Sequence, residues 1–123
     1  MRRSRLIASA SSAIAGAVVL LVTLMPSASA ASAVHYVALG DSYSSGVGSG
    51  SYTSASGSCL RSTLAYSQLW ANAHAPASYV SVACSGAKTT DVTANQLSAL
   101  SSTTTLVSIT IGGNDVNFAG VME

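Results

Sequence analysis

The sequence is poor in charged residues: Asp, Glu, Lys and Arg make up only 7% of its 123 residues. Three of the five basic residues lie within the first five positions, which leaves Arg61 and Lys88 for the rest of the chain. Past Ala33 these two face four acidic residues, so the net charge is slightly negative. A nucleic-acid-binding protein needs a basic patch or stripe, and none occurs here. We therefore expect no nucleic-acid partner.

Cysteine and histidine are also scarce, with two of each. There is no Cys-x-x-Cys spacing, and two cysteines with two distant histidines do not make a metal site. In an exported protein, an even number of cysteines indicates a disulfide, here between Cys59 and Cys84. Such a bridge closes a loop of about 25 residues and is worth about 3 kcal/mol. Two buried free thiols remain the alternative.

The N-terminal residues have the pattern of a signal peptide. Three arginines precede an apolar stretch over residues 6–25, and Pro26 and a run of small residues follow. This order predicts a signal peptide over residues 1–30, with cleavage after Ala30 or Ala33 and secretion of the mature chain. A retained membrane anchor is the alternative, but the uninterrupted apolar core falls short of about 18 residues. We expect no stable membrane span after cleavage.

The rest of the chain alternates between strand and helix patterns, without an internal repeat. β-branched or apolar runs predict strands over residues 34–39, 79–83 and 106–111. One predicted helix is capped by Ser62 and runs through Leu64, Leu69 and Ala73 to just before Pro76; the other is capped by Thr89 or Thr90 and carries Ala94, Leu97 and Leu100. Strand, helix, strand, helix, strand is typical of a parallel sheet covered by helices, which is the α/β class.

Three segments follow the carboxyl ends of these strands, where sites in such sheets gather. They are residues 40–42, 84–86 and 112–115. A serine just past a buried strand is well placed as a nucleophile, which makes Ser42 the candidate. The amides of Ser42 and Gly86 and the side chain of Asn114 could then stabilise an oxyanion. Each segment alone is also a common turn or loop, and the prediction depends on their meeting at one edge.

These segments resemble the conserved blocks of the GDSL or SGNH hydrolases. Residues 38–46, Ala-Leu-Gly-Asp-Ser-Tyr-Ser-Ser-Gly, resemble the first block, residues 85–87 the second and residues 111–115 the third. Order and spacing agree over residues 34–122, and the likeness is greatest to secreted lipases and esterases of actinobacterial type. Tyr43 replaces the leucine of the family's name, as is common in that branch.

The resemblance implies a three-layer α/β/α, flavodoxin-like fold and hydrolysis of a small-molecule or lipid ester through an acyl-enzyme. Ser42 would be the nucleophile, with Ser42, Gly86 and Asn114 as the oxyanion hole. No metal or cofactor would be needed, and we expect the full-length protein to be a monomer. The secreted branch also carries a cysteine pair like that of this chain.

The resemblance also implies a histidine in an Asp-x-x-His block, which does not occur up to Glu123. We expect His35 and His74 to lie at the edge of the sheet far from Ser42, out of reach for a general base. About three of the family's five strands are present. We therefore expect residues 34–123 to be a truncated N-terminal part of the hydrolase domain, which folds poorly and is weakly active or inactive.

Two other functions are compatible with parts of the sequence. A secreted binding module could keep the same edge of the sheet without chemistry. A nucleotide site is a weaker alternative, because the glycines of residues 46–50 lack the third glycine of the dinucleotide motif. Lys88 likewise lacks the preceding glycine of a phosphate loop.

Overall fold

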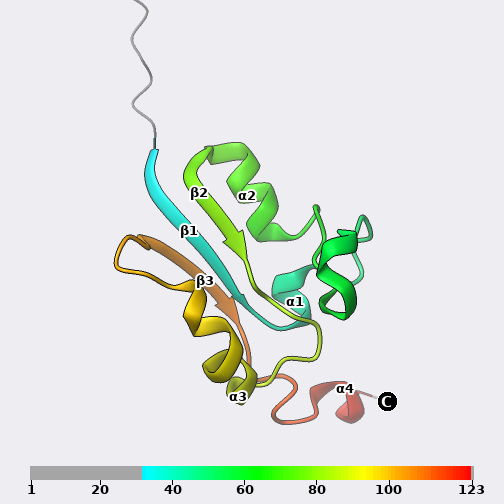
Figure 1. Cartoon of the computed structure of the whole chain (residues 1–123). Helices are drawn as coiled ribbons and strands as arrows, with labels where there is room; N and C mark the ends of the chain where they lie inside the picture. The colour runs from blue at the N-terminus through cyan, green and yellow to red at the C-terminus, as the bar shows by residue number, and fades with distance from the viewer. Residues whose placement is uncertain (1–31, 123) are drawn as a thin grey trace, which may run out of the picture.

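The computed structural model of the chain describes residues 32–122. Its centre is a parallel sheet in the order β2-β1-β3, formed by β1 (Ser32–Gly40), β2 (Pro76–Ser81) and β3 (Leu106–Thr110). Figure 1 shows β1 between its two neighbours. The α/β parallel sheet expected from the sequence is confirmed, and the signal peptide predicted for residues 1–30 lies outside the described residues.

β1 is the central strand because its sequence can be buried on both faces. Tyr36, Val37, Ala38 and Leu39 are each 5% exposed or less, as expected for a near-continuous apolar run in a parallel sheet. β3 instead alternates between half-buried and exposed residues. The best-buried strand is therefore the one that leads into Ser42.

Short helices and turns connect the strands. Figure 1 shows α2 and the segment that begins with α3 on opposite sides of the sheet. The helical elements are α1 (Ser42–Ser45), α2 (Tyr66–His74), α3 (Thr89–Asp91) and α4 (Phe118–Val121), with η1 (Ser54–Cys59), the π-helical turn η2 (Val92–Gln96) and η3 (Leu97–Ala99).

The predicted cap of the first long helix was wrong. α2 begins at Tyr66, after an extended Ala65. Ser62 lies in the preceding loop, where its hydroxyl donates to the Gly50 carbonyl and accepts the Leu64 amide proton. The serine therefore joins two loops and caps no helix.

The face of α2 that packs on the sheet carries small residues. The buried positions are Ser67 and Ala71, whereas Leu64 and Leu69 are nearly half exposed. The aromatic rings of Tyr36, Trp70 and Tyr79 fill the space between helix and sheet. Small residues therefore face the sheet, and the Ser67 hydroxyl bonds the Tyr79 hydroxyl at 2.8 Å.

The second predicted helix is present but irregular. Lys88, and neither threonine, occupies the cap, where its amide donates to the Asp91 carboxylate at 2.9 Å. After one turn the helix widens into η2, whose buried residues are Val92 and Gln96. Leu97 is nearly half exposed. Val92 and Gln96 lie four positions apart and share the buried face, which places a glutamine against the end of β1.

Gly40 should tolerate no side chain. Its φ is +124°, and a Cβ would lie 2.3 Å from the Thr110 carbonyl oxygen and 2.6 Å from Ser44 Oγ. We expect Gly40→Ala to lower the free energy of unfolding by about 2–5 kcal/mol through strain and overpacking. Chemical denaturation measures the loss.

Gly48→Ala is the matched control, because Gly48 also has a positive φ, +92°, but open space where the Cβ would be. It should lose only the backbone part, about 1–2 kcal/mol. Equal losses at the two glycines would show that the contact with Thr110 is not the constraint.

Candidate active site

The turn that carries Ser42 is fixed by the carboxylate of Asp41. Asp41 is the N-cap of α1 and is only 8% exposed. Its Oδ1 accepts the Tyr43 amide proton at 3.1 Å and the Thr110 hydroxyl proton at 2.8 Å. The Asp41 amide donates to the Thr110 carbonyl at 3.0 Å. The start of α1 is thereby fastened to the end of β3.

Beneath this turn lies a cluster of hydroxyl groups. Ser44 is fully buried, and its Oγ lies 2.6 Å from Thr110 Oγ1 and 3.0 Å from the Tyr66 hydroxyl. Ser44 Oγ also accepts the Thr110 amide proton at 3.1 Å. The second residue after Ser42 is therefore held by a strand and by α2 at once.

Ser42 itself is half-buried. Among residues 32–122, none hydrogen-bonds the Ser42 hydroxyl or accepts from its amide. Its carbonyl accepts from the amides of Gly46 and Val47 at 3.0 Å each. The turn is held in place, and the Ser42 hydroxyl and amide keep no hydrogen-bond partner within it. Such a serine is suited to attack a substrate.

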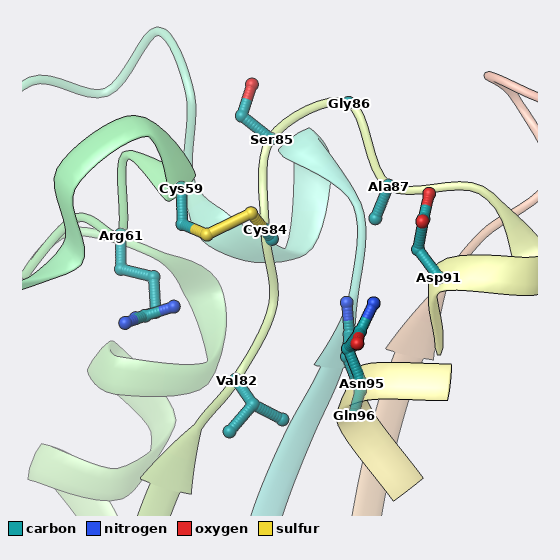
Figure 2. Close-up of a pocket in the computed structure, with 10 residues that line it drawn as sticks. All are labelled: Cys59, Arg61, Val82, Cys84, Ser85, Gly86, Ala87, Asp91, Asn95 and Gln96. Atoms are coloured by element: carbon teal, nitrogen blue, oxygen red, sulfur yellow. A yellow bond between two sulfur atoms is a disulfide. The ribbon is translucent and has the colours of Figure 1, made fainter. Parts of the chain in front are cut away.

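The second segment is fixed by the disulfide between Cys59 and Cys84, whose existence the cysteine pair predicts. The Cys84 amide donates to the Gly40 carbonyl at 3.0 Å, which places this loop beside the end of β1. The Ser85 amide donates to the Cys59 carbonyl at 3.1 Å. Figure 2 shows the loop rising from the disulfide through Ser85 to Gly86.

Gly86 stands at the corner of a tight turn. The Ala87 amide donates to the Cys84 carbonyl at 3.1 Å, and Gly86 has a φ of +79°. Such a positive φ at the third position of a turn favours glycine. Gly86 is exposed, and within residues 32–122 its amide has no hydrogen-bond acceptor. A peptide N–H is thus presented to solvent.

The third segment crosses over to the second through Asn114. This residue is half-buried, and its Nδ2 donates to the Ala87 carbonyl at 2.9 Å. A carboxamide nitrogen carries two hydrogens. The bond to Ala87 therefore sets the orientation of the amide and leaves one N–H for another acceptor.

Asp115 forms a second connection between the loop after β3 and the segment after β2. Its carboxylate accepts the Thr89 amide proton at 3.1 and 3.2 Å and the Thr89 hydroxyl proton at 2.6 Å. These hydrogen bonds, chiefly from the Thr89 side chain, hold the pKa of Asp115 below its ordinary value, and the Lys88 charge adds to them. The loop after β3 is thereby fixed to the start of α3.

A cavity of about 420 Å³ opens beside the Gly86 loop. The Arg61 guanidinium, which donates to the Ala83 carbonyl at 3.2 Å, lines it together with the disulfide. Figure 2 shows Asp91, Asn95 and Gln96 on the opposite side. The cavity thus lies between the loop held by the disulfide and the π-helical turn.

Neither His35 nor His74 hydrogen-bonds Ser42 or the residues around it. His35 Nδ1 lies 2.9 Å from Ser78 Oγ, at the start of β1 and β2. His74, at the end of α2, stacks on Trp70 and bonds the Trp70 carbonyl at 2.8 Å. Both have structural partners away from the carboxyl ends of the strands.

Residues 32–122 contain no group of three or more His, Cys, Asp or Glu side chains that could hold a metal ion. Within the same residues, no helix is long and apolar enough to cross a membrane.

Comparison with known proteins identifies the arrangement. The model of the GDSL-like lipase/acylhydrolase family matches residues 38–123. The chain belongs to this family. It is 56% identical over 124 aligned residues to Lipase 1 of Streptomyces coelicolor and 62% identical over 90 residues to a lipase of Streptomyces rimosus.

Two solved structures share the fold. The phospholipase A1 of Streptomyces albidoflavus has a TM-score of 0.69 at 64% identity over 71% of this chain, and the extracellular lipase of S. rimosus has 0.70 at 62% over 72%. The chain spans 46% and 34% of the two curated lipases and 37% and 38% of the solved chains.

The three segments proposed from the sequence do come together, but the hydrogen bonds that hold them in place were not predicted. Thr110, Asp115 and Gln96 connect the segments, and each looks ordinary in the sequence. Gln96 gave one signal that could have been used: it follows Val92 by four positions, so a helix that buries the valine also turns the glutamine inward.

The bond between Asp115 and Thr89 should make stability depend on pH. Because its pKa is lowered, the contribution of Asp115 is complete above the ordinary value of 3.8 and is lost as the pH falls through the lower, folded-state pKa. We expect Asp115→Asn to have a lower denaturation midpoint than the wild type at pH 7. The difference should narrow as the pH falls below about 4. A difference that stays constant down to pH 3 would contradict the assignment.

Proposed function

We propose that this chain carries the nucleophile and the oxyanion hole of a secreted carboxylic-ester hydrolase, with Ser42 as the nucleophile. The observation that carries the proposal is the meeting of three strand ends around an unengaged serine. The Gly40 carbonyl accepts the Cys84 amide proton, and the Asp41 amide donates to the Thr110 carbonyl. The Asn114 side-chain amide donates to the Ala87 carbonyl.

In the proposed reaction, Ser42 Oγ attacks the ester carbonyl carbon and forms an acyl-enzyme. Its proton passes to a general base and then to the departing alcohol. Water attacks the acyl-enzyme in the second half, again with loss of a proton to the base, and releases the carboxylic acid and free Ser42. The reaction balances without a metal or redox cofactor.

The carbonyl oxygen becomes negatively charged during each attack, and fixed donors are needed to stabilise it. Three are proposed: the amides of Ser42 and Gly86 and the second N–H of Asn114. The two backbone amides have no acceptor among the described residues, and the bond to Ala87 holds the third donor in place. Such donors act before the charge forms and need no reorganisation.

The general base is not assigned to His35 or His74, because both have partners away from Ser42. The family resemblance implies a histidine from an Asp-x-x-His block, which residues 32–122 do not supply. The chain as far as Glu123 is accordingly expected to show weak activity or none.

Secretion is part of the proposal and has three supports. The first thirty residues have the signal-peptide pattern, a disulfide fits an oxidising compartment, and the solved S. rimosus relative is described as extracellular. The relatives' names, lipase and phospholipase A1, favour a lipid ester as the substrate class.

The test is Ser42→Ala in the product of the full reading frame. We expect the variant to lose hydrolysis of a p-nitrophenyl ester by about a million-fold in kcat, as when a serine nucleophile is removed, and to lose covalent labelling by a fluorophosphonate. Ser58→Ala is the matched control, since Ser58 is exposed and lies in η1.

Hydrolysis that persists in Ser42→Ala would refute the nucleophile assignment. If neither the wild type nor the variant reacts while a lipid ester still binds both, the chain is the binding module considered above.

Removal of the Asn114 side-chain donor should lower kcat more than it weakens substrate binding. We expect Asn114→Ala to lower kcat by about 10²–10³-fold with KM nearly unchanged, because the oxyanion exists only in the transition state. Steady-state kinetics measure both constants. Thermal unfolding must be recorded alongside, because the variant also loses the bond to Ala87. A rise in KM with kcat unchanged would contradict the role.

A further inference from the structure

The Gln96 side chain hydrogen-bonds a backbone amide and a backbone carbonyl, as a neighbouring strand would. It is only 3% exposed. The Gly40 amide donates to Gln96 Oε1 at 2.7 Å, and Gln96 Nε2 donates to the Gly40 carbonyl at 2.9 Å. One carboxamide thus pairs with both polar groups of a single residue 56 positions away.

The residue that Gln96 holds is the junction of the site. The Gly40 carbonyl also accepts the Cys84 amide proton at 3.0 Å, and Cys84 leads directly into Gly86. On its other side Gly40 is followed by Asp41 and Ser42. A displacement of Gly40 would therefore move the nucleophile turn and the oxyanion loop relative to each other.

Gln96 lies in a π-helical turn, η2. The Leu97 amide donates to the Val92 carbonyl, a π-helical bond that spans five residues. Single π turns inside helices are often found at functional sites. Here the turn buries Val92 and Gln96 together, while Asn95 between them is exposed.

We propose that Gln96 is a positioning residue for the hydrolytic reaction, which sets the distance between Ser42 and the Gly86 amide through Gly40. This inference rests on the proposed function. Gln96 does not touch the substrate in this view; it acts through the end of β1. Misplacement of reacting groups by about 1 Å can cost about a hundredfold in rate.

Two substitutions separate positioning from mere packing. Gln96→Met keeps the length of the side chain and removes both hydrogen bonds. We expect kcat for a p-nitrophenyl ester to fall by about 10–100-fold with KM within about twofold, because the methionine side chain occupies the same part of the cavity lining. Measurements are made on the product of the full reading frame, at a temperature below the unfolding transition of every variant. Asn72→Asp is the control, because Asn72 is exposed in α2 and does not line the cavity, and it should keep the wild-type kcat.

Gln96→Glu supplies a pH-dependent readout. A protonated glutamic acid has one donor and one acceptor and can reproduce both bonds to Gly40, whereas the ionised form loses the donor and faces the carbonyl. Burial disfavours the charged form. We expect the ratio of variant to wild-type kcat to rise toward one as the pH is lowered from 8 to 5. The ratio for Asn72→Asp should not change with pH.

The outcomes also separate this inference from the proposed function. If Ser42→Ala abolishes hydrolysis but folded Gln96→Met and Gln96→Glu keep the wild-type kcat at every pH, the positioning role is wrong and the nucleophile stands. A loss confined to stability or to KM overturns it as well. If Ser42→Ala stays active, the proposed function fails first. Should Gln96→Met not fold, the pH profile of Gln96→Glu decides alone.

Discussion

The structure depends on how the end of β1 satisfies its backbone groups. Gly40 has one amide and one carbonyl, and these receive Gln96 and Cys84, while the next amide donates to Thr110. A buried peptide group without a partner costs about 1–3 kcal/mol, so each bond is strongly favoured. Cys84 follows β2, Gln96 lies in the helical segment before β3, and Thr110 ends β3. Satisfying the backbone groups of Gly40 and Asp41 therefore brings the ends of the three strands together.

A second feature is that the turn of Ser42 lies on a cluster of hydroxyl groups. Among residues 32–122, Asp41 is the one buried carboxylate, and it accepts the Thr110 hydroxyl proton beside Ser44. Hydroxyl groups both donate and accept, so Ser44, Thr110 and Tyr66 can satisfy one another in a small space. Such a network holds a turn rigid without the desolvation penalty of a buried ion pair.

The fold class and the meeting of the three segments could be predicted from the sequence, because they follow from the order of strands and from the rule that parallel strands end at one edge. The details of the helices could not. In α2 the buried residues are Ser67 and Ala71, which lie beside the aromatic rings of the sheet, and Leu69 is nearly half exposed. In the next helical segment Gln96 is buried and Leu97 is exposed. Ser62 was read as a cap although its partner, Gly50, lies twelve positions away. These choices depend on tertiary contacts that local patterns do not record.

The central position of β1 has a consequence for the order of assembly. The first strand to be synthesised has its neighbours later in the chain, and the bond from Thr110 to Asp41 joins residues 69 positions apart. Such distant pairings form slowly, because the loop between them must close first. A nascent chain that ends before Thr110 carries Ser42, the proposed nucleophile, on a turn without its hydrogen bonds to β3. The arrangement described for the site therefore forms only after most of the described chain has been made.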